Sequence, residues 1–486
     1  MARLTFPTSP RSAWRGCGHL LVIGRGDRLE RGVSSLPDGA EDIVSQLAAE
    51  AKFGRGGAVA TSLVPGGAVP RVTVGLLPST SSRYNARGRP DVIARAVSGA
   101  RLTRSDRATV VFCVEDPADL PAMLTGLARG LPLFDRTSQG RSAEAKISIL
   151  ALGPEDELLK IESSERTRIG AVRDAARLVD TPPTELDPEA FAKEARKALE
   201  PLKRVSLKEI SGPALARNGL GGIFGVGKAA VSPPRLLIAT YRPTRPRGPH
   251  VALVGKGVTF DTGGLHLKGR GSMEGMKCDM GGAAAVFGAF RVLADSGVPM
   301  QVSLLLCLAE NAIGPASYKP DDILTLHSGK TVEINNTDAE GRLLLADGLS
   351  WAARSLGATV LFDAATLTGA QLVATGANHA AVVSNDADLE ELLVEAGQAS
   401  GDLVHPLPFA PEFYQAEFKS PVADMRNSVK NRANAQSSCA AQFLWSHIDD
   451  TDVRWGHVDL AGPAWQGDRG TGYGVSLLTE AVRRLA

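Results

Sequence analysis

Three charged residues stand directly in front of an apolar run in the segment N-N-T-D-A-E-G-R-L-L-L-A-D-G-L. They are Asp338, Glu340 and Arg342, at positions i, i+2 and i+4. On a helix the first two side chains would diverge, whereas in extended chain all three point to the same side. We therefore expect residues 337–342 to be an extended strand end, followed by a helix from about Leu343. Charges at the edge of a buried helix are costly unless something neutralises them.

A second charged segment is V-G-K-G-V-T-F-D-T-G-G-L-H-L-K-G-R-G-S-M-E-G-M-K-C-D-M-G-G. Lys256 follows a predicted buried strand, 251–255, and Asp261, Lys268 and Asp279 come after it, with glycines near each charge. Singly, each charge fits a surface loop, and Asp279 would make a good helix N-cap. Together they end successive elements of one α/β unit, so we expect them to meet the first segment at one rim of a sheet.

Four carboxylates on one rim would repel one another unless cations lie among them. Such oxygen-rich sites suit magnesium, manganese or zinc, and a pair of ions roughly 3.5 to 4 Å apart can activate water and polarise a carbonyl. A lysine near the cations would have its pKa lowered and could bind a metal as a neutral amine. The other lysine and Arg342 could then stabilise an oxyanion or hold a small anion. The four carboxylates are Asp261, Asp279, Asp338 and Glu340.

Alternating apolar and helical segments predict an α/β protein whose sheets are mostly parallel. In the first third, strands are expected near residues 20, 74, 110 and 148. Further along, strands are expected at 251–255, 302–309 and 358–367, and helices at 281–294 and 343–357. Because these later elements form repeated βαβ units, catalytic groups should lie at the carboxyl ends of the strands.

The length of 486 residues is too great for one ordinary core and predicts two domains. A helical stretch ends in T-P-P-T near residue 184, where two prolines close the helix. We place a smaller N-terminal α/β domain at 1–155, a connecting helix and linker at 156–185, and a larger catalytic α/β domain at 186–486. The central sheet of the larger domain is expected to be mixed but largely parallel, with helices on its flanks.

The overall composition predicts a cytoplasmic globular protein. A net charge of +1 argues against nucleic acid or an anionic membrane as the main partner. No apolar run reaches the roughly 18 to 20 residues of a membrane helix. The first 26 residues contain several arginines and no acid before Asp27, but an expected first strand at 19–23 leaves only a short ragged end. The cysteines form no C-x-x-C pair and fit a reducing compartment; they are Cys17, Cys113, Cys278, Cys307 and Cys439.

Other catalytic motifs are incomplete. The segment 221–230, G-G-I-F-G-V-G-K-A-A, resembles a phosphate-binding loop, but Ala229 replaces the hydroxyl residue that would hold magnesium, so a glycine-rich turn is the better interpretation. There is no G-x-S-x-G and no H-E-x-x-H, which disfavours serine-hydrolase and histidine-zinc chemistry. His266 is the only histidine near the charged segments, and we expect it to be structural.

Three long motifs resemble those of the leucine aminopeptidase, or cytosol aminopeptidase, family of two-metal exopeptidases. They are V-G-K-G-V-T-F-D-T-G-G, M-K-C-D-M-G-G-A-A and N-T-D-A-E-G-R-L. The segments E-N-A-I-G-P-A-S-Y-K-P-D-D-I and W-G-H-V-D-L-A-G-P-A-W support the resemblance, which covers the chain from about residue 170 onward. It implies hydrolysis of the N-terminal peptide bond of short peptides.

The resemblance also implies a set of metal ligands. Asp261 and Glu340 would bridge the two ions, which would be manganese or zinc, or magnesium. Lys256 and Asp279 would complete the tighter site, with Lys256 as a neutral amine ligand. Asp338 would complete the more exchangeable site. The free amine of the substrate would bind one metal, which would restrict cleavage to the N-terminus.

Further roles follow from the same resemblance. Lys268 would act as an electrophile beside the substrate carbonyl, and Arg342 would hold a bicarbonate ion that acts as general base. A pocket for a leucine-like first side chain would be lined by Met276, Thr366, Leu367, Thr368 and Gly369.

The family form is a homohexamer, which we expect here on resemblance alone. His266 and the arginine of G-R-G at 269–271 depart from the commonest family pattern and bear on fine specificity. Two other functions remain as alternatives. A metal-dependent phosphoester hydrolase would need neither the lysine ligand nor the apolar pocket, and a catalytically silent binding protein of the same fold would usually have lost ligands.

Overall fold

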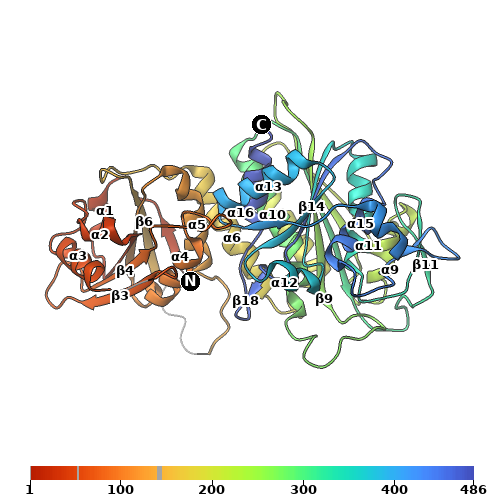
Figure 1. Cartoon of the computed structure of the whole chain (residues 1–486), viewed down its shortest axis with the longest axis horizontal. Helices are drawn as coiled ribbons and strands as arrows, with labels where there is room; N and C mark the ends of the chain where they lie inside the picture. The colour runs from red at the N-terminus through yellow and green to blue at the C-terminus, as the bar shows by residue number, and fades with distance from the viewer. Residues whose placement is uncertain (1, 52–53, 139–144) are drawn as a thin grey trace. The chain divides into compact units, whose positions relative to one another are not determined.

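The computed structural model describes residues 2–51, 54–138 and 145–486, which form two compact units (Figure 1). The first unit contains the chain up to Arg173 and the short segment Gln398–Gly401. The second contains Asp174–Gly397 and Asp402–Ala486. The division at Arg173 falls inside the segment 156–185 that we predicted to connect two domains, and the exact boundaries at 155 and 186 stay a prediction.

The first unit is built on a six-stranded sheet of order β1-β6-β5-β2-β4-β3. All neighbouring pairs are parallel except β3 with β4. Its strands are β1 (Ala2–Thr5), β2 (His19–Arg25), β3 (Ala58–Leu63), β4 (Arg71–Leu77), β5 (Arg107–Cys113) and β6 (Ala145–Leu152). Its helices are α1 (Pro10–Trp14), α2 (Gly26–Glu30), α3 (Ala40–Glu50), α4 (Pro90–Ala100) and α5 (Leu120–Arg129).

The four strands predicted for this unit are confirmed, but the start of the chain was predicted wrongly. Strand β1 and helix α1 lie where we expected only a ragged end before a first strand at 19–23. Strand β1 has four residues and was missed because A-R-L-T gives too short an apolar pattern. It pairs in parallel with β6, so it is the edge strand of the sheet.

The second unit is built on an eight-stranded mixed sheet of order β15-β14-β17-β13-β9-β10-β8-β7. Four central strands, β10, β9, β13 and β17, are mutually parallel, as predicted for the site-bearing part of the sheet. The strands are β7 (Val205–Ser211), β8 (Arg235–Tyr241), β9 (Val251–Asp261), β10 (Val302–Asn311), β13 (Val360–Ala365), β14 (Ala380–Ser384), β15 (Val404–Pro406) and β17 (Arg454–Asp459). Shorter strands are β11 (Ile323–Thr325), β12 (Thr331–Glu333), β16 (Met425–Arg426), β18 (Trp465–Gln466) and β19 (Arg469–Gly470).

Helices cover both faces of this sheet. They are α6 (Ser163–Asp180), which begins in the first unit, α7 (Pro188–Leu199), α8 (Pro213–Arg217), α9 (Gly221–Gly227), α10 (Gly281–Ser296), α11 (Gly341–Ser350), α12 (Gly369–Thr375), α13 (Ala387–Ser400), α14 (Pro411–Tyr414), α15 (Gln436–Trp445) and α16 (Val475–Arg483). Along β9, a Cβ on Gly255 would meet α10, whereas the next residue, Lys256, contacts the start of α11. Since successive strand residues point to opposite faces, α10 and α11 pack on opposite sides of β9.

Residues 221–227 of the glycine-rich segment form a short helix, α9, so the turn that we predicted for 221–230 is limited to the residues after Gly227. Its N-terminus is capped from within the protein, because Asp347 of α11 accepts a hydrogen bond from the backbone N–H of Ile223 at 2.9 Å. A Cβ on Gly222 would lie 2.3 Å from the carbonyl oxygen of Leu343, so glycine allows this close packing of α9 on α11. Asp347 therefore takes the place at the helix N-terminus that an anion would need.

No helix in the described ranges is both long enough and apolar enough to cross a membrane.

Candidate metal and active site

The site lies at the carboxyl ends of the central parallel strands. Strand β9 runs from Val251 to Asp261, so Lys256 lies within the strand. The prediction that Lys256 follows the strand was wrong, because the apolar run is shorter than the strand itself. Asp261, at the end of β9, is paired in register with Asn311, at the end of β10. Asn311 Nδ2 and the backbone N–H of Gly263 each donate to Asp261 Oδ1 at 2.8 Å. The strand ends thus fix the orientation of this carboxylate.

Lys256 joins three elements beneath the rim. Its Nζ lies 2.6 Å from Asp279 Oδ1, 2.9 Å from Glu340 Oε1 and 2.9 Å from the carbonyl oxygen of Thr366. Asp279 belongs to a 3-10 turn, Met276–Met280, just before α10, and is not the N-cap residue, which is Met280. Glycine at the start of α11 makes room for the lysine, because a Cβ on Gly341 would lie 2.4 Å from Lys256 Cε.

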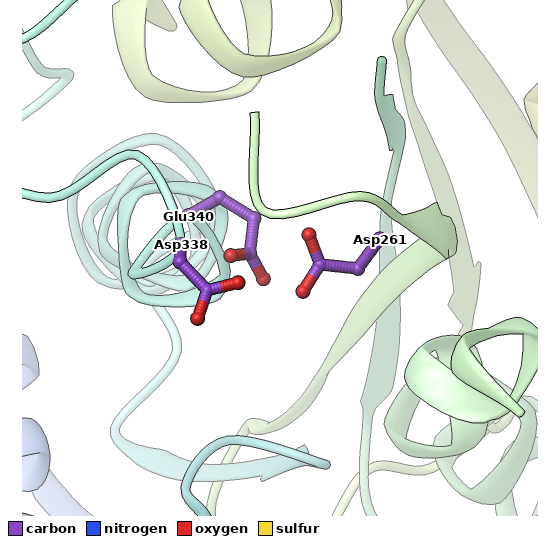
Figure 2. A group of neighbouring side chains, drawn as sticks. All are labelled: Asp261, Asp338 and Glu340. Atoms are coloured by element: carbon purple, nitrogen blue, oxygen red, sulfur yellow. The ribbon is translucent and has the colours of Figure 1, made fainter. Parts of the chain in front are cut away.

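Asp338 and Glu340 lie in a turn before α11 and not on an extended strand end, so that prediction was wrong. Glu340 is the N-cap residue in helical conformation, and α11 begins at Gly341, two residues earlier than expected. The turn still brings Asp338 to the end of β9, because Asp338 Oδ1 lies 2.6 Å and Asp261 Oδ2 lies 2.7 Å from Lys268 Nζ. Figure 2 shows the three carboxylates directed toward a shared space, and their nearest oxygens all lie within 4.8 Å of one another.

Four carboxylates and two ammonium groups therefore form one cluster, which we call the carboxylate–lysine cluster; its members are Lys256, Asp261, Lys268, Asp279, Asp338 and Glu340. Burial raises the pKa of Asp279 well above its ordinary value, although Lys256 opposes this. Burial and then Asp261 raise the pKa of Glu340, again against Lys256. Burial alone would lower the pKa of Lys256, but Asp279 and Glu340 outweigh it and raise the pKa.

The donor set fits divalent cations. Among the described residues, Asp279 Oδ2 and Glu340 Oε2 are buried without a hydrogen-bond partner. Leaving a buried carboxylate oxygen unpaired is costly, and hard or borderline divalent ions are the usual partners of such oxygens. Four acids against two lysines also leave an excess of negative charge that cations would balance.

Arg342 lies in the first turn of α11 and is buried, 8% exposed. Its Nη1 donates to the carbonyl oxygen of Asn427 at 2.9 Å. Its Nε has no hydrogen-bond partner in the described part of the chain. Burial lowers the pKa of Arg342 to about 10, while Glu340 opposes that shift. A buried guanidinium with a donor to spare is suited to a small anion.

The predicted pocket residues lie on two separate segments. Met276 begins the 3-10 turn of Asp279, and Thr366 Oγ1 donates to Asp279 Oδ1 at 2.8 Å, which ties the two segments together. Leu367 is half-buried, and Thr368 and Gly369 form the N-terminus of α12, where the Thr368 hydroxyl caps the helix. The role of these residues in a side-chain pocket stays a prediction.

The structure adds residues to which the sequence analysis assigned no role. Asp459, at the end of β17, accepts from the backbone N–H of Leu367 at 3.1 Å and from Thr368 Oγ1 at 2.6 Å. Asn427 accepts from the backbone N–H of Asn335 and donates to the carbonyl oxygen of Asn336, which holds the turn before α11. Asp459, like Asn311, was detectable as a polar residue that ends a buried strand, whereas Asn427 carries no such signal.

His266 has a structural role within the site loop, as expected. Its Nδ1 accepts a hydrogen bond from the backbone N–H of Thr337 at 3.1 Å, and its own backbone N–H donates to Thr337 Oγ1 at 2.8 Å. These bonds join the loop after β9 to the turn that carries Asp338.

Comparisons with known proteins agree with this geometry. Residues 173–479 match the model of the cytosol aminopeptidase family catalytic domain, and residues 21–139 match M17 aminopeptidase N-terminal domain 2. The chain belongs to the cytosol aminopeptidase family. It is accordingly a hydrolase of the leucyl aminopeptidase type, and the two-domain α/β fold that we predicted is confirmed.

Individual members of the cytosol aminopeptidase family are similar over most of the chain. A probable aminopeptidase, NPEPL1, of Homo sapiens is 45% identical over 413 residues, which cover 84% of this chain and 78% of that protein. The apo structure of leucyl aminopeptidase from Trypanosoma cruzi is 38% identical with a TM-score of 0.90, and the match covers 99% of this chain and 97% of that one. The bottromycin maturation enzyme BotP, solved in complex with Mn, is 29% identical with a TM-score of 0.80, covering 96% and 99%. The family is metal-dependent, in agreement with the carboxylate–lysine cluster.

Proposed function

We propose that this protein removes the N-terminal residue of short peptides, with a preference for leucine-like first residues, by means of two divalent metal ions. One observation carries the proposal: four carboxylates converge at the strand ends, and two of their buried oxygens lack partners among the described residues. In a family of metal-dependent aminopeptidases, this donor set is best explained as a metal centre.

We assign the ligands as follows. Asp261 and Glu340 would be ligands of both ions, Lys256 and Asp279 would complete one site, and Asp338 would complete the other. Figure 2 supports the shared part of this assignment, since the carboxylates of Asp261, Asp338 and Glu340 face one another. Manganese and zinc are the leading candidates, with magnesium third. Bound there, two such ions lower the pKa of a water molecule and polarise the peptide carbonyl.

Lys256 binds as a neutral amine in this proposal. The acids of the protein alone raise its pKa, and cations in the same place act in the opposite direction. Its short contacts with Asp279 and Glu340 are consistent with a ligand position, because they place its Nζ beside two other ligand side chains.

Two further residues act in catalysis, one on the substrate carbonyl and one on the proton of the attacking water. Lys268, whose amine lies at the open side of the cluster between Asp261 and Asp338, stabilises the oxyanion that develops on the carbonyl oxygen. Arg342, whose Nε has no hydrogen-bond partner among the described residues, would hold a bicarbonate ion, which would supply a general base for the attacking water. Met276, Thr366, Leu367, Thr368 and Gly369 contact the first side chain of the peptide.

The resemblance to the family also leads us to propose a homohexamer that acts in the cytoplasm on small peptides. Neither nucleic acid nor a membrane is a partner in this proposal.

Metal removal tests the central claim. Protein stripped with a chelator should lose at least about 99% of its activity on leucine p-nitroanilide, and manganese or zinc should restore it. Elemental analysis of the restored protein should give two ions per chain. N-acetyl-leucine p-nitroanilide should not be cleaved, because its blocked amine cannot bind a metal.

Two results would contradict the proposal. Stoichiometric metal loading without turnover on any free-amine substrate would favour a silent binding protein. Equal turnover of free and acetylated substrates would exclude recognition of the free amine.

A further inference from the structure

A cavity of about 380 Å³ opens next to Lys268 in the second unit. Its walls include the apolar side chains of Phe260 and Met273 and the glycine-rich loop from Lys268 to Gly275. Lys268 belongs to both the cavity lining and the carboxylate–lysine cluster, so the two adjoin at this residue. A peptide held at the cluster would extend its second residue into this cavity.

Three cations line the cavity, and two of them are engaged. Lys268 pairs with Asp261 and Asp338. Lys277 donates to the carbonyl oxygen of Asp180 at 2.6 Å and lies over the ring of Trp465.

The third cation, Arg270, is exposed and makes no hydrogen bond or ion pair with the described residues. The wall also carries one exposed acid, Glu274, which makes no ion pair with the described residues. Arg270 is thus the lining cation that makes neither a hydrogen bond nor an ion pair with the described residues.

Arg270 lies two residues after Lys268 in the chain. Two residues span at most about 7 Å of chain, and in a dipeptide the terminal carboxylate lies one residue, roughly 3.5 Å, beyond the scissile carbonyl. An arginine side chain is long enough to cover the difference of roughly 3.5 Å between these two lengths. A guanidinium also binds a carboxylate through two parallel hydrogen bonds, which a lysine cannot do.

We propose that Arg270 binds the C-terminal carboxylate of di- and tripeptide substrates and makes the enzyme selective for very short peptides. This inference rests on the proposed function, because it needs the peptide carbonyl at Lys268. Phe260 and Met273 contact the side chain of the second residue, and Glu274 disfavours an anion in the same cavity.

The test compares substrates that differ only in the terminal carboxylate: leucylglycine, leucylglycine amide and leucine p-nitroanilide. Arg270→Ala should raise the KM for leucylglycine about tenfold, the usual scale for a charge-assisted contact, and change the KM of the other two less than about twofold. Arg270→Lys should give an intermediate value. Glu274→Gln, in the same loop, should lower the KM for leucylglycine and leave that for the amide unchanged.

Each other outcome overturns the assignment. If Arg270→Ala raises the KM for the peptide and its amide equally, the residue shapes the loop and does not recognise the carboxylate. If neither changes, Arg270 does not contact the substrate.

Failure of the wild-type protein to cleave any of the three would overturn the proposed function instead. In that case, calorimetric binding of leucylglycine and its amide to the metal-loaded wild type and Arg270→Ala would still decide on Arg270.

Discussion

Both sheets of this protein carry charged residues at the carboxyl ends of parallel strands, but the two units differ in whether these charged side chains have partners. In the first unit, Arg28 lies 2.6 Å from Asp156 Oδ1, and Ser34 donates to Asp156 Oδ2 from its backbone N–H at 2.8 Å and from its hydroxyl at 2.7 Å. Both oxygens of this carboxylate are therefore paired, although Glu115 nearby keeps one buried oxygen without a partner among the described residues.

In the second unit, four carboxylates share two lysines, and Asp279 and Glu340 each keep a buried oxygen without a partner in the part of the chain that the structure describes. The same strand-end geometry thus gives a mostly self-sufficient ion pair in one unit and an excess of acid in the other. The excess, and not the mere presence of charge at the rim, distinguishes a site that needs cations.

The largest contrast should come from one substitution at each rim. Glu340→Gln removes a carboxylate that we propose as a ligand of both ions, so it should lower kcat/KM at least about 1,000-fold, roughly 4 kcal/mol, and weaken manganese binding measured by calorimetry. Asp156→Asn should lower the free energy of unfolding by about 1 kcal/mol, because it breaks a half-buried ion pair, and leave kcat/KM within about twofold. A strong activity loss in Asp156→Asn would end the distinction between the two rims.

A smaller effect should follow from the residue that holds the loop after β13. Asp459→Asn keeps the shape of the side chain but replaces the oxygen that accepts from Thr368 Oγ1. The loop also carries Thr366, which contacts Lys256 and Asp279, so kcat/KM should fall about 10- to 30-fold.

Thr368→Val removes the same bond from the other side and serves as the matched variant. The double variant should lose no more activity than the more affected single variant. Additive losses would show that Asp459 acts elsewhere.

The last prediction concerns acid stability, a property in which the two units should behave alike. Burial, followed by nearby cations, lowers the pKa of His447 in the second unit to about 3, and burial lowers that of His19 in the first to about 4, from an ordinary value of 6.5. The unfolded chain therefore binds protons more readily. The free energy of unfolding is intact above pH 6.5 and falls as the pH drops toward these values, by about 1.4 kcal/mol per pH unit for each histidine.

Urea unfolding between pH 4.5 and 7 checks this expectation. His447→Gln and His19→Gln should each reduce the slope by about 1.4 kcal/mol per pH unit in the transition of their own unit. An unchanged slope in either variant would mean that the histidine is protonated in the folded state.

Much of the fold was predictable because buried parallel strands give continuous apolar runs. The four runs near residues 20, 74, 110 and 148 and the central strands of the second unit are of this kind. Strand β1 and the antiparallel edge strand β3 were missed because edge strands are short or only half-buried.

The site was predictable as a set of residues but not as a local conformation. The strand-end rule correctly brought Asp261, Asp279 and Asp338 together, although the segment before α11 is a turn. The i, i+2, i+4 spacing of the charged residues could not by itself distinguish an extended strand end from a turn, because Asn427 fixes the turn from a distant part of the chain. Long-range hydrogen bonds of this kind leave no pattern in the local sequence.

The position of Lys256 within the central strand has a consequence for folding. Its partners are 23 residues away at Asp279 and 110 residues away at Thr366, so the cluster exists only after β9, the 3-10 turn and β13 have docked. Metal ions cannot nucleate such a site in the unfolded chain, as zinc does in a small finger domain. Ions bound at the proposed site would instead bind late, after the apolar core has formed, and would slow unfolding and stabilise the folded state.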